Sequence, residues 1–124
     1  PEAEQMFRRM TFNIMAKNCD DHTKNFAFLL KKAEKWQLAP AYDVCYAYNP
    51  ENYWLHNQTM SLRGKQDNFT KEDLLSIGKD NSIKKASYII EEVQDAVSQW
   101  LLFAKEAGVG TDKAKILQKT FPKV

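Results

Sequence analysis

A stripe of apolar residues in the last third of the chain constrains the fold more than any other feature. Its members recur at intervals of three and four positions: Ile83, Ala86, Ile89, Ile90, Val93, Ala96, Val97, Trp100, Leu101 and Ala104. This spacing places them on one face of an amphipathic helix about six turns long. Gly108 follows at a position typical of a helix end. The rest of the chain therefore has to supply elements that cover this face.

Three shorter segments are also predicted to be helical. Residues 3–17 carry one apolar face among charged neighbours, formed by Ala3, Met6, Phe7, Met10 and Ile14. Residues 70–73 read Thr-Lys-Glu-Asp, which is the form of a capping box at a helix start, and Gly78 is predicted to end that helix. A last short helix is expected over residues 112–120, before Pro122.

A β-hairpin is predicted after residue 25. Residues 26–30 and 36–40 are rich in aromatic and branched side chains and are separated by the charged residues 31–35. We expect the first of these strands to be buried. Trp36 and Tyr42 are expected to pack in the core, although a ring close to the loop at residues 18–25 could instead line a functional site. The predicted fold is therefore α+β and mostly α, with one small antiparallel hairpin.

The segments between the hairpin and the helix that begins near residue 70 have weaker patterns. Residues 41–58 are rich in Tyr and Asn and are interpreted as irregular, with a helical turn over residues 44–48. A short strand is expected over residues 59–62, followed by a turn at residues 63–65. Neither the length nor the pattern suggests an internal repeat, and residues 1–124 are predicted to form a single domain.

Composition excludes several classes of protein. The chain has 124 residues, 44% hydrophobic and 27% charged, which excludes global disorder. The net charge of +2 is too small to favour binding to nucleic acid or to an anionic membrane. No apolar run approaches the roughly 18 residues that span a bilayer. Cys19 and Cys45 do not form a disulfide framework, so a cytoplasmic location is expected.

The densest group of chemically active side chains lies at residues 18–25, which read Asn-Cys-Asp-Asp-His-Thr-Lys-Asn. Carboxylates and an ammonium group so close to an apolar segment are costly to desolvate unless each finds a partner. Such a loop is typical of an active site. Within it, Cys19 is expected to be a buried packing residue rather than a redox sensor, and Asp21 is expected to be a solvated carboxylate with no special role.

Asp20, Asn25 and Asp43 follow one another in the order that phosphoryl transfer in protein kinases requires. In that template an Asp accepts the proton of the substrate hydroxyl, and an Asn five positions later binds Mg²⁺. A second Asp, after a hairpin, holds the same metal. Mg²⁺ prefers hard oxygen ligands, and the charge on the transferred phosphoryl group must be neutralised by groups already in place.

The sequence around these residues resembles the HipA family of bacterial serine/threonine kinases, which are the toxins of toxin–antitoxin pairs. The resemblance is carried by four motifs: Asp20-x-His22-x-Lys24-Asn25, Leu38-x-Pro40-x-Tyr42-Asp43, Met60-Ser61-Leu62-x-Gly64-Lys65 and Phe69-Thr70-x-x-Asp73-Leu74-Leu75. It is strongest over residues 18–75 and weak over the last helices. The first two motifs together are specific, whereas either one alone is not.

The resemblance implies roles for individual residues. Asp20 would be the catalytic base, and Asn25 and Asp43 would bind Mg²⁺ and so hold the phosphates of ATP. Lys24 would belong to the catalytic group, where it could neutralise phosphate or pair with Asp20. His22 is assigned to the cofactor-binding group and could orient the loop through hydrogen bonds of its ring.

The same resemblance implies partners and a boundary. The expected substrate is a Ser or Thr hydroxyl of a protein, for example glutamyl-tRNA synthetase, and the expected partner is a HipB-like antitoxin that binds DNA. Only 19 residues precede Asp20, and no glycine-rich cluster is present. The chain is therefore interpreted as the C-terminal lobe of a kinase domain without its N-terminal nucleotide-binding lobe. By itself it is expected to bind ATP weakly and to turn over negligibly.

Two other functions are compatible with the sequence. The first is a non-catalytic, pseudokinase-like module that docks onto a partner. The second is a metal-dependent phosphoesterase that uses Asp20, Asp21 and His22 as ligands. The second is weaker, because such sites normally need more His and Asp ligands and the chain has only His22 and His56.

Overall fold

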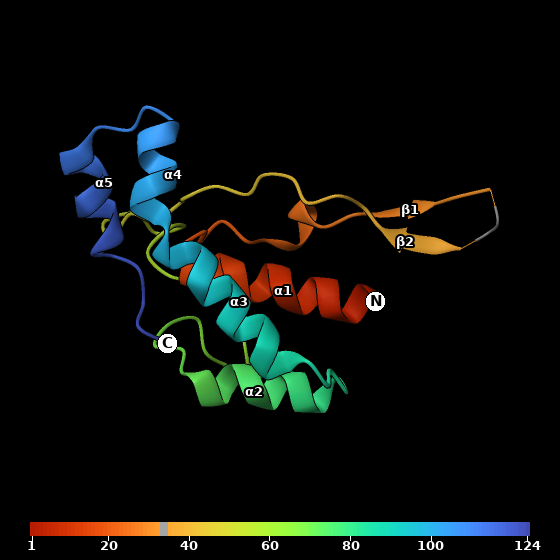
Figure 1. Ribbon diagram of the computed structural model, residues 1–124. Helices are drawn as coiled ribbons and strands as arrows, with labels where there is room; N and C mark the ends of the chain where they lie inside the picture. The colour runs from red at the N-terminus through yellow and green to blue at the C-terminus, as the bar shows by residue number, and fades with distance from the viewer. Residues whose placement is uncertain (33–34) are drawn as a thin grey trace.

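The computed structural model describes residues 1–32 and 35–124 and consists of a helical body from which a β-hairpin projects (Figure 1). In these ranges the elements are α1 (Glu2–Met15), the 3₁₀ turn η1 (Thr23–Asn25), β1 (Phe28–Leu30), β2 (Trp36–Leu38), α2 (Lys71–Asp80), α3 (Ala86–Ser98), α4 (Trp100–Glu106) and α5 (Thr111–Gln118). The predicted α+β, mostly helical fold is confirmed. None of the helices in the described ranges has the length and hydropathy to cross a membrane.

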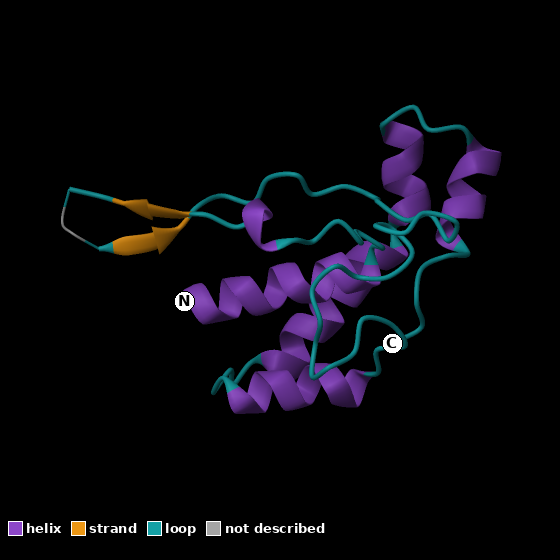
Figure 2. Cartoon of the chain, turned by 180° about the vertical axis from the view of Figure 1, so that it is seen from behind, coloured by secondary structure: helices purple, strands orange, loops and turns teal. Residues whose placement is uncertain are grey.

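The core lies where α1 and α2 pack against α3 (Figures 1 and 2). The apolar stripes predicted for residues 3–17 and 83–104 supply much of it, together with side chains from the segment before α2. Its buried members are Phe7, Ile14, Met15, Leu62, Phe69, Leu74, Ile83, Ala86, Ile89, Ile90 and Val93. The helical periodicity therefore identified the correct faces of α1 and α3.

Gly78 does not end α2, contrary to the sequence prediction. The helix continues to Asp80, and Gly78 is buried where α2 meets α3. A Cβ atom at Gly78 would lie 2.4 Å from the Cβ of Ala86, which real structures do not tolerate. The glycine is therefore explained by the close approach of two helices.

Three helices end in the same way, with one residue in the left-handed conformation. These residues are Lys17 after α1, Ser82 after α2 and Gly108 after α4, with φ values of 55°, 56° and 79°. In each case the next residue donates its N–H to a carbonyl five positions back, as in a Schellman motif; the three bonds are Asn18 to Asn13, Ile83 to Gly78 and Val109 to Ala104. The predicted stop at Gly108 is confirmed.

The long helix predicted over residues 83–104 is interrupted at Gln99, which separates α3 from α4. The Ser98 hydroxyl donates to the carbonyl of Asp95 at 2.6 Å, and this kind of bond bends helices. After the bend, the Trp100 indole donates to the carbonyl of Ala114 in α5. The interruption therefore turns α4 away from the core and pairs it with α5.

The hairpin is present, but its burial was predicted wrongly. β1 and β2 are antiparallel, and Phe28, Leu29 and Leu30 are each about half exposed. Trp36 is 64% exposed and Tyr42 is also exposed, so neither ring belongs to the core. Figures 1 and 2 show the reason, since the two strands extend beyond the helical body and meet no other element. The predicted turn residues Ala33 and Glu34 lie outside the described residues.

Two local predictions between the hairpin and α2 are also wrong. Residues 44–48 do not form a helical turn, because Ala47 instead makes a parallel bridge to Asn18. Residues 59–62 do not form a strand; a single bridge joins Leu62 to Lys65. The capping box is confirmed, with Thr70 accepting from the N–H of Asp73 and the Asp73 carboxylate accepting from the N–H of Thr70.

Candidate functional site

The polar loop begins where α1 ends. The left-handed residue Lys17 turns the chain, and Asn18 and Cys19 then run beside Ala47. The Cys19 N–H donates to the Ala47 carbonyl at 2.9 Å, and the Ala47 N–H donates to the Lys17 carbonyl at 3.0 Å. The helix end and this short bridge fix the direction in which the loop leaves the body.

Gln58 joins the polar loop to residues 58–60, and we call the contact between residues 18–21 and 58–60 the loop junction. The Gln58 amide nitrogen donates to the Asn18 carbonyl at 3.0 Å and to a carboxylate oxygen of Asp21 at 3.1 Å. Its amide oxygen accepts from the Cys19 thiol at 3.2 Å. Gln58 is buried, so these bonds form away from water. Sequence reasoning missed Gln58, which lies in a segment without a periodic pattern.

Asp21 is buried, and the prediction that it is a solvated, incidental carboxylate is wrong. One carboxylate oxygen accepts from the backbone N–H groups of Thr59 at 2.8 Å and Met60 at 3.2 Å, and the other accepts from Gln58. Burial raises the pKa of Asp21 above its ordinary value, and the Met60, Gln58 and Thr59 donors oppose that rise. The loop junction therefore contains a carboxylate whose two oxygens are both hydrogen-bonded.

The two cysteines lie in contrasting environments. Cys19 is fully buried, which confirms the prediction that it is a packing residue, and burial raises the pKa of its thiol to about 11. Cys45 is exposed, and partial burial raises the pKa of its thiol, with a further contribution from the negative charges of Asp43 and Asp20.

Asp20 is held by its backbone and keeps its carboxylate accessible. The side-chain amide of Asn25 donates to the Asp20 carbonyl at 3.0 Å, and the Asp20 side chain is 45% exposed. Asn25 closes η1, since its own N–H donates to the His22 carbonyl. The structure therefore brings Asp20 and Asn25 together through a main-chain contact and leaves the Asp20 carboxylate free to act on another molecule.

His22 and Lys24 make less specific contacts than the sequence suggested. The His22 Nε2 atom lies 3.8 Å from a carboxylate oxygen of Asp20, which is too long for a hydrogen bond, and its Nδ1 atom has no partner among the described residues. The proposed ring hydrogen bonds are thus not seen. Lys24 is exposed and pairs with no carboxylate in the described ranges, although its carbonyl accepts from the Tyr42 hydroxyl at 2.7 Å.

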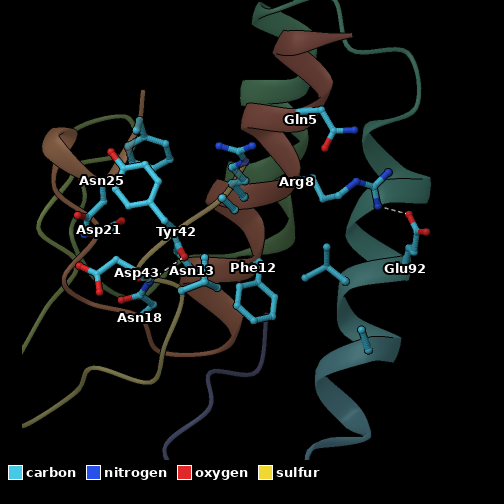
Figure 3. Close-up of a pocket in the computed structure, with 16 residues that line it drawn as sticks. Gln5, Arg8, Phe12, Asn13, Asn18, Asp21, Asn25, Tyr42, Asp43 and Glu92 are labelled. Carbon is cyan, nitrogen blue, oxygen red and sulfur yellow. Dashed lines mark hydrogen bonds and ion pairs between the residues drawn. The ribbon is translucent and has the colours of Figure 1, made fainter. Parts of the chain in front are cut away.

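Asn25 and Asp43 line the same cavity, which has a volume of about 560 Å³ and lies between the polar loop, α1 and α3. Figure 3 shows Asn18, Asp21, Asn25, Tyr42 and Asp43 along one side of it, with Arg8 of α1 and Glu92 of α3 forming an ion pair on the other. Tyr42 lines this cavity rather than the core. Arg9 also lines it and donates to the Ala39 carbonyl at 2.5 Å. Neither arginine belongs to the motifs from which the site was predicted.

Asp43 has a backbone conformation that is unusual for a residue with a side chain. Its φ of 55° lies in the left-handed region, which costs on the order of 1 kcal/mol at sites where structure is held for function. The Asn18 side-chain amide donates to the Asp43 carbonyl at 3.3 Å and helps to hold this conformation. The Asp43 main chain is thus held from the polar loop.

Two residues of this cavity have the chemistry that a magnesium site of the predicted kind would need. Asn25 uses its nitrogen for the bond to Asp20, which leaves its amide oxygen available, and Asp43, a carboxylate residue, lines the same cavity. Mg²⁺ is usually held by one or two protein oxygens together with water and phosphate. The described residues contain no group of three or more His, Cys, Asp or Glu side chains that could hold a metal.

Comparison with known proteins gives a family for the chain. The sequence model of the HipA-like C-terminal domain matches residues 1–101. The chain therefore belongs to the HipA-like C-terminal domain family, as the four motifs suggested. No curated protein and no solved structure matches it significantly.

Proposed function

We propose that this chain forms the catalytic and metal-binding part of a serine/threonine protein kinase. The observation that carries the proposal concerns three residues that the phosphoryl-transfer template requires, of which two line one cavity and the third, Asp20, is bonded through its carbonyl to one of them. Asn25 and Asp43 line one cavity, and Asn25 holds the backbone of Asp20. The order of these three residues in the sequence supports the same function, and so does the membership of the chain in the HipA-like C-terminal domain family.

Asp20 has the properties of the base in this proposal. Its carboxylate is accessible, and its main chain is held, so that the carboxylate can meet a substrate hydroxyl at a defined position. It would accept the proton of the substrate hydroxyl as the hydroxyl oxygen bonds to the γ-phosphorus of ATP, while the bond from that phosphorus to the bridging oxygen breaks and ADP leaves. Asn25 and Asp43 would hold Mg²⁺, which would supply charge neutralisation at the phosphates.

Two cations belong to the same region of the protein, Lys24 in the polar loop and Arg9 in the wall of the cavity. Lys24 is exposed beside the base and is free to meet an incoming phosphate or an acidic substrate. Arg9 lies in the wall of the cavity that Asn25 and Asp43 share. By family resemblance the acceptor is a protein such as glutamyl-tRNA synthetase, and the regulatory partner is a HipB-like antitoxin.

The test compares two exposed carboxylates in the complete gene product. Asp20→Asn should lower the transfer of labelled γ-phosphate from MgATP, to the protein itself or to glutamyl-tRNA synthetase, by about 100-fold or more. Asp112→Asn, at the exposed start of α5, should change neither transfer nor stability. Transfer that survives Asp20→Asn in full would refute the catalytic proposal.

A non-catalytic docking role is the second candidate, because one observation favours it. Phe28, Leu29, Leu30 and Trp36 expose an apolar surface on the projecting hairpin, and surfaces of this kind often mark interaction sites. If Asp20→Asn leaves transfer unchanged but Leu29→Lys abolishes association with a partner, the docking role replaces the kinase.

A further inference from the structure

We infer that Asp21 is a positioning residue, which fixes the place of the neighbouring catalytic base by tying the polar loop to residues 58–60. This inference rests on the proposed kinase function. Asp20 and Asp21 are adjacent in sequence but lie in opposite environments. The Asp21 residue is 6% exposed, whereas the Asp20 side chain is 45% exposed. One carboxylate is buried and hydrogen-bonded, and the other is accessible from outside the protein.

The Asp21 side chain has little freedom to move. One of its oxygens accepts from the backbone N–H groups of Thr59 and Met60, and the other accepts from the Gln58 amide. Two of these donors are main-chain groups, so they cannot rotate away. Any rotation of the carboxylate would break bonds to three donors at once, one of them the amide of the buried Gln58, which is unfavourable. Asp21 is therefore bonded to a continuous segment of main chain on the far side of the loop junction.

The residue before Asp20 is held by the same segment. The Cys19 carbonyl accepts from the Thr59 N–H at 3.1 Å and from the Thr59 hydroxyl at 2.8 Å. The Asp20 carbonyl itself accepts from Asn25. Hydrogen bonds thus hold three consecutive residues, namely Cys19, Asp20 and Asp21, so that the chain is fixed on both sides of the base. The Asp20 carboxylate retains only its own side-chain torsions, which is the preorganisation that proton abstraction requires.

Burial of Asp21 at this position has a physical cost, because desolvation raises the pKa of its carboxyl group. An apolar residue could fill the same space, but it would remove the acceptor of the Met60 N–H and one of the two acceptors of the Thr59 N–H, which also donates to the Cys19 carbonyl. The carboxylate is the side chain that can bind both of these donors and Gln58 together. Its chemistry suits an anchor for the loop, whereas a ligand or a base would need an accessible oxygen.

The experiment uses the complete gene product with Asp21→Asn as the near-isosteric variant. The amide keeps one oxygen for Thr59 and Met60 but places an N–H₂ group against Gln58. We expect phosphoryl transfer from MgATP to fall roughly ten- to 100-fold. The dissociation constant of a fluorescent ADP analogue with Mg²⁺ should stay within about threefold of the original, because Asn25 and Asp43 are unchanged. Equal losses of transfer and of nucleotide affinity would show general damage and would overturn the inference.

Amide hydrogen exchange provides a readout that does not depend on activity. In Asp21→Asn we expect faster exchange at Thr59, at Met60 and across residues 19–25, with no change in α3. The control variant Asp112→Asn should leave all of these rates unchanged. Unchanged exchange in the loop, or unchanged transfer in Asp21→Asn, would overturn the positioning role.

The two proposals fail in distinguishable ways. If the unsubstituted protein transfers no phosphate, the kinase proposal falls, and exchange alone decides whether Asp21 holds the loop. If the unsubstituted protein is active and Asp20→Asn is inactive, but Asp21→Asn is fully active, the kinase proposal stands and the inference about Asp21 falls.

Discussion

The loop junction and the β-hairpin are consecutive in the chain but differ in an unexpected way. The loop junction is built from polar residues, and Asn18, Asp21 and Gln58 are all buried in it. The hairpin that follows is apolar, and Phe28, Leu29 and Leu30 are each about half exposed. The usual relation between polarity and burial is therefore reversed over a short stretch of sequence.

The difference shows two separate means of making a local structure. In the loop junction, hydrogen bonds between buried groups fix a single arrangement, because each buried donor or acceptor needs its own partner. In the hairpin, the register pairs Phe28 with Leu38 and Leu30 with Trp36, and of these four side chains Phe28, Leu30 and Trp36 are exposed. We therefore expect substitutions in the loop junction to cost stability and substitutions in the hairpin to cost little.

The largest effect on stability is expected from Gln58→Ala. This change removes the partners of the Asp21 carboxylate, the Asn18 carbonyl and the Cys19 thiol at once. Because the groups left behind are buried, the free energy of unfolding should fall by about 3 kcal/mol. Chemical denaturation of the variant, followed by circular dichroism, measures this change.

Gln66→Ala is the matched control for that measurement. Gln66 also bonds to the loop junction, since its amide nitrogen donates to the Thr59 carbonyl at 3.1 Å, but it is exposed. Water can replace its bond, and the loss should stay below about 1 kcal/mol. Equal losses in the two variants would mean that burial does not set the strength of the loop junction.

Thiol labelling compares buried and exposed positions without any substitution. Burial raises the pKa of Cys19 to about 11, against an ordinary value of 9.0. At neutral pH its reactive thiolate fraction is therefore lower by about 100-fold than that of an ordinary thiol, and access is blocked as well. Iodoacetamide should modify Cys45 in the folded protein and leave Cys19 unmodified, as mass spectrometry of the peptides would show. Both should react in denaturant, and rapid labelling of Cys19 in native buffer would contradict a closed loop junction.

A smaller effect is expected from Thr59→Val. The change removes only the hydroxyl that donates to the Cys19 carbonyl at 2.8 Å, while the Thr59 N–H still donates to Cys19 and Asp21. The free energy of unfolding should fall by about 1 kcal/mol. Thermal unfolding measures it, and a loss as large as that of Gln58→Ala would show that the backbone bonds fail without the hydroxyl.

The contrast between these regions also explains which features the sequence could predict. The faces of α1 and α3 follow from periodic spacing, because any helix with that pattern must bury the same side. The capping box at Thr70 and Asp73 is local and was found for the same reason. The motif residues Asp20, Asn25 and Asp43 were found through their order, and Asn25 and Asp43 share a cavity in the structure.

The remaining errors concern contacts between distant segments. Asp21 is buried because residues 58–60 present donors to it, and nothing near Asp21 in the sequence reports their presence. Gly78 was taken for a helix end because its role, close contact with Ala86, depends on how α2 meets α3. Burial of strand β1 was inferred from its composition, but burial requires a covering element, and in the described residues the hairpin has none.

The smallest effect is expected in the hairpin and is best measured with two identical changes. Leu29 of β1 is 47% exposed, whereas Leu74 of α2 is fully buried. Leu29→Ala should lower the free energy of unfolding by less than about 1 kcal/mol, because the residue contributes only cross-strand contacts. Leu74→Ala removes the same atoms from the core and should cost about 3 kcal/mol, since it leaves a cavity among α1, α2 and α3. If Leu29→Ala proved as costly as Leu74→Ala, the hairpin would have to be covered in solution, by another segment or another molecule, and its exposed surface would then be an interface.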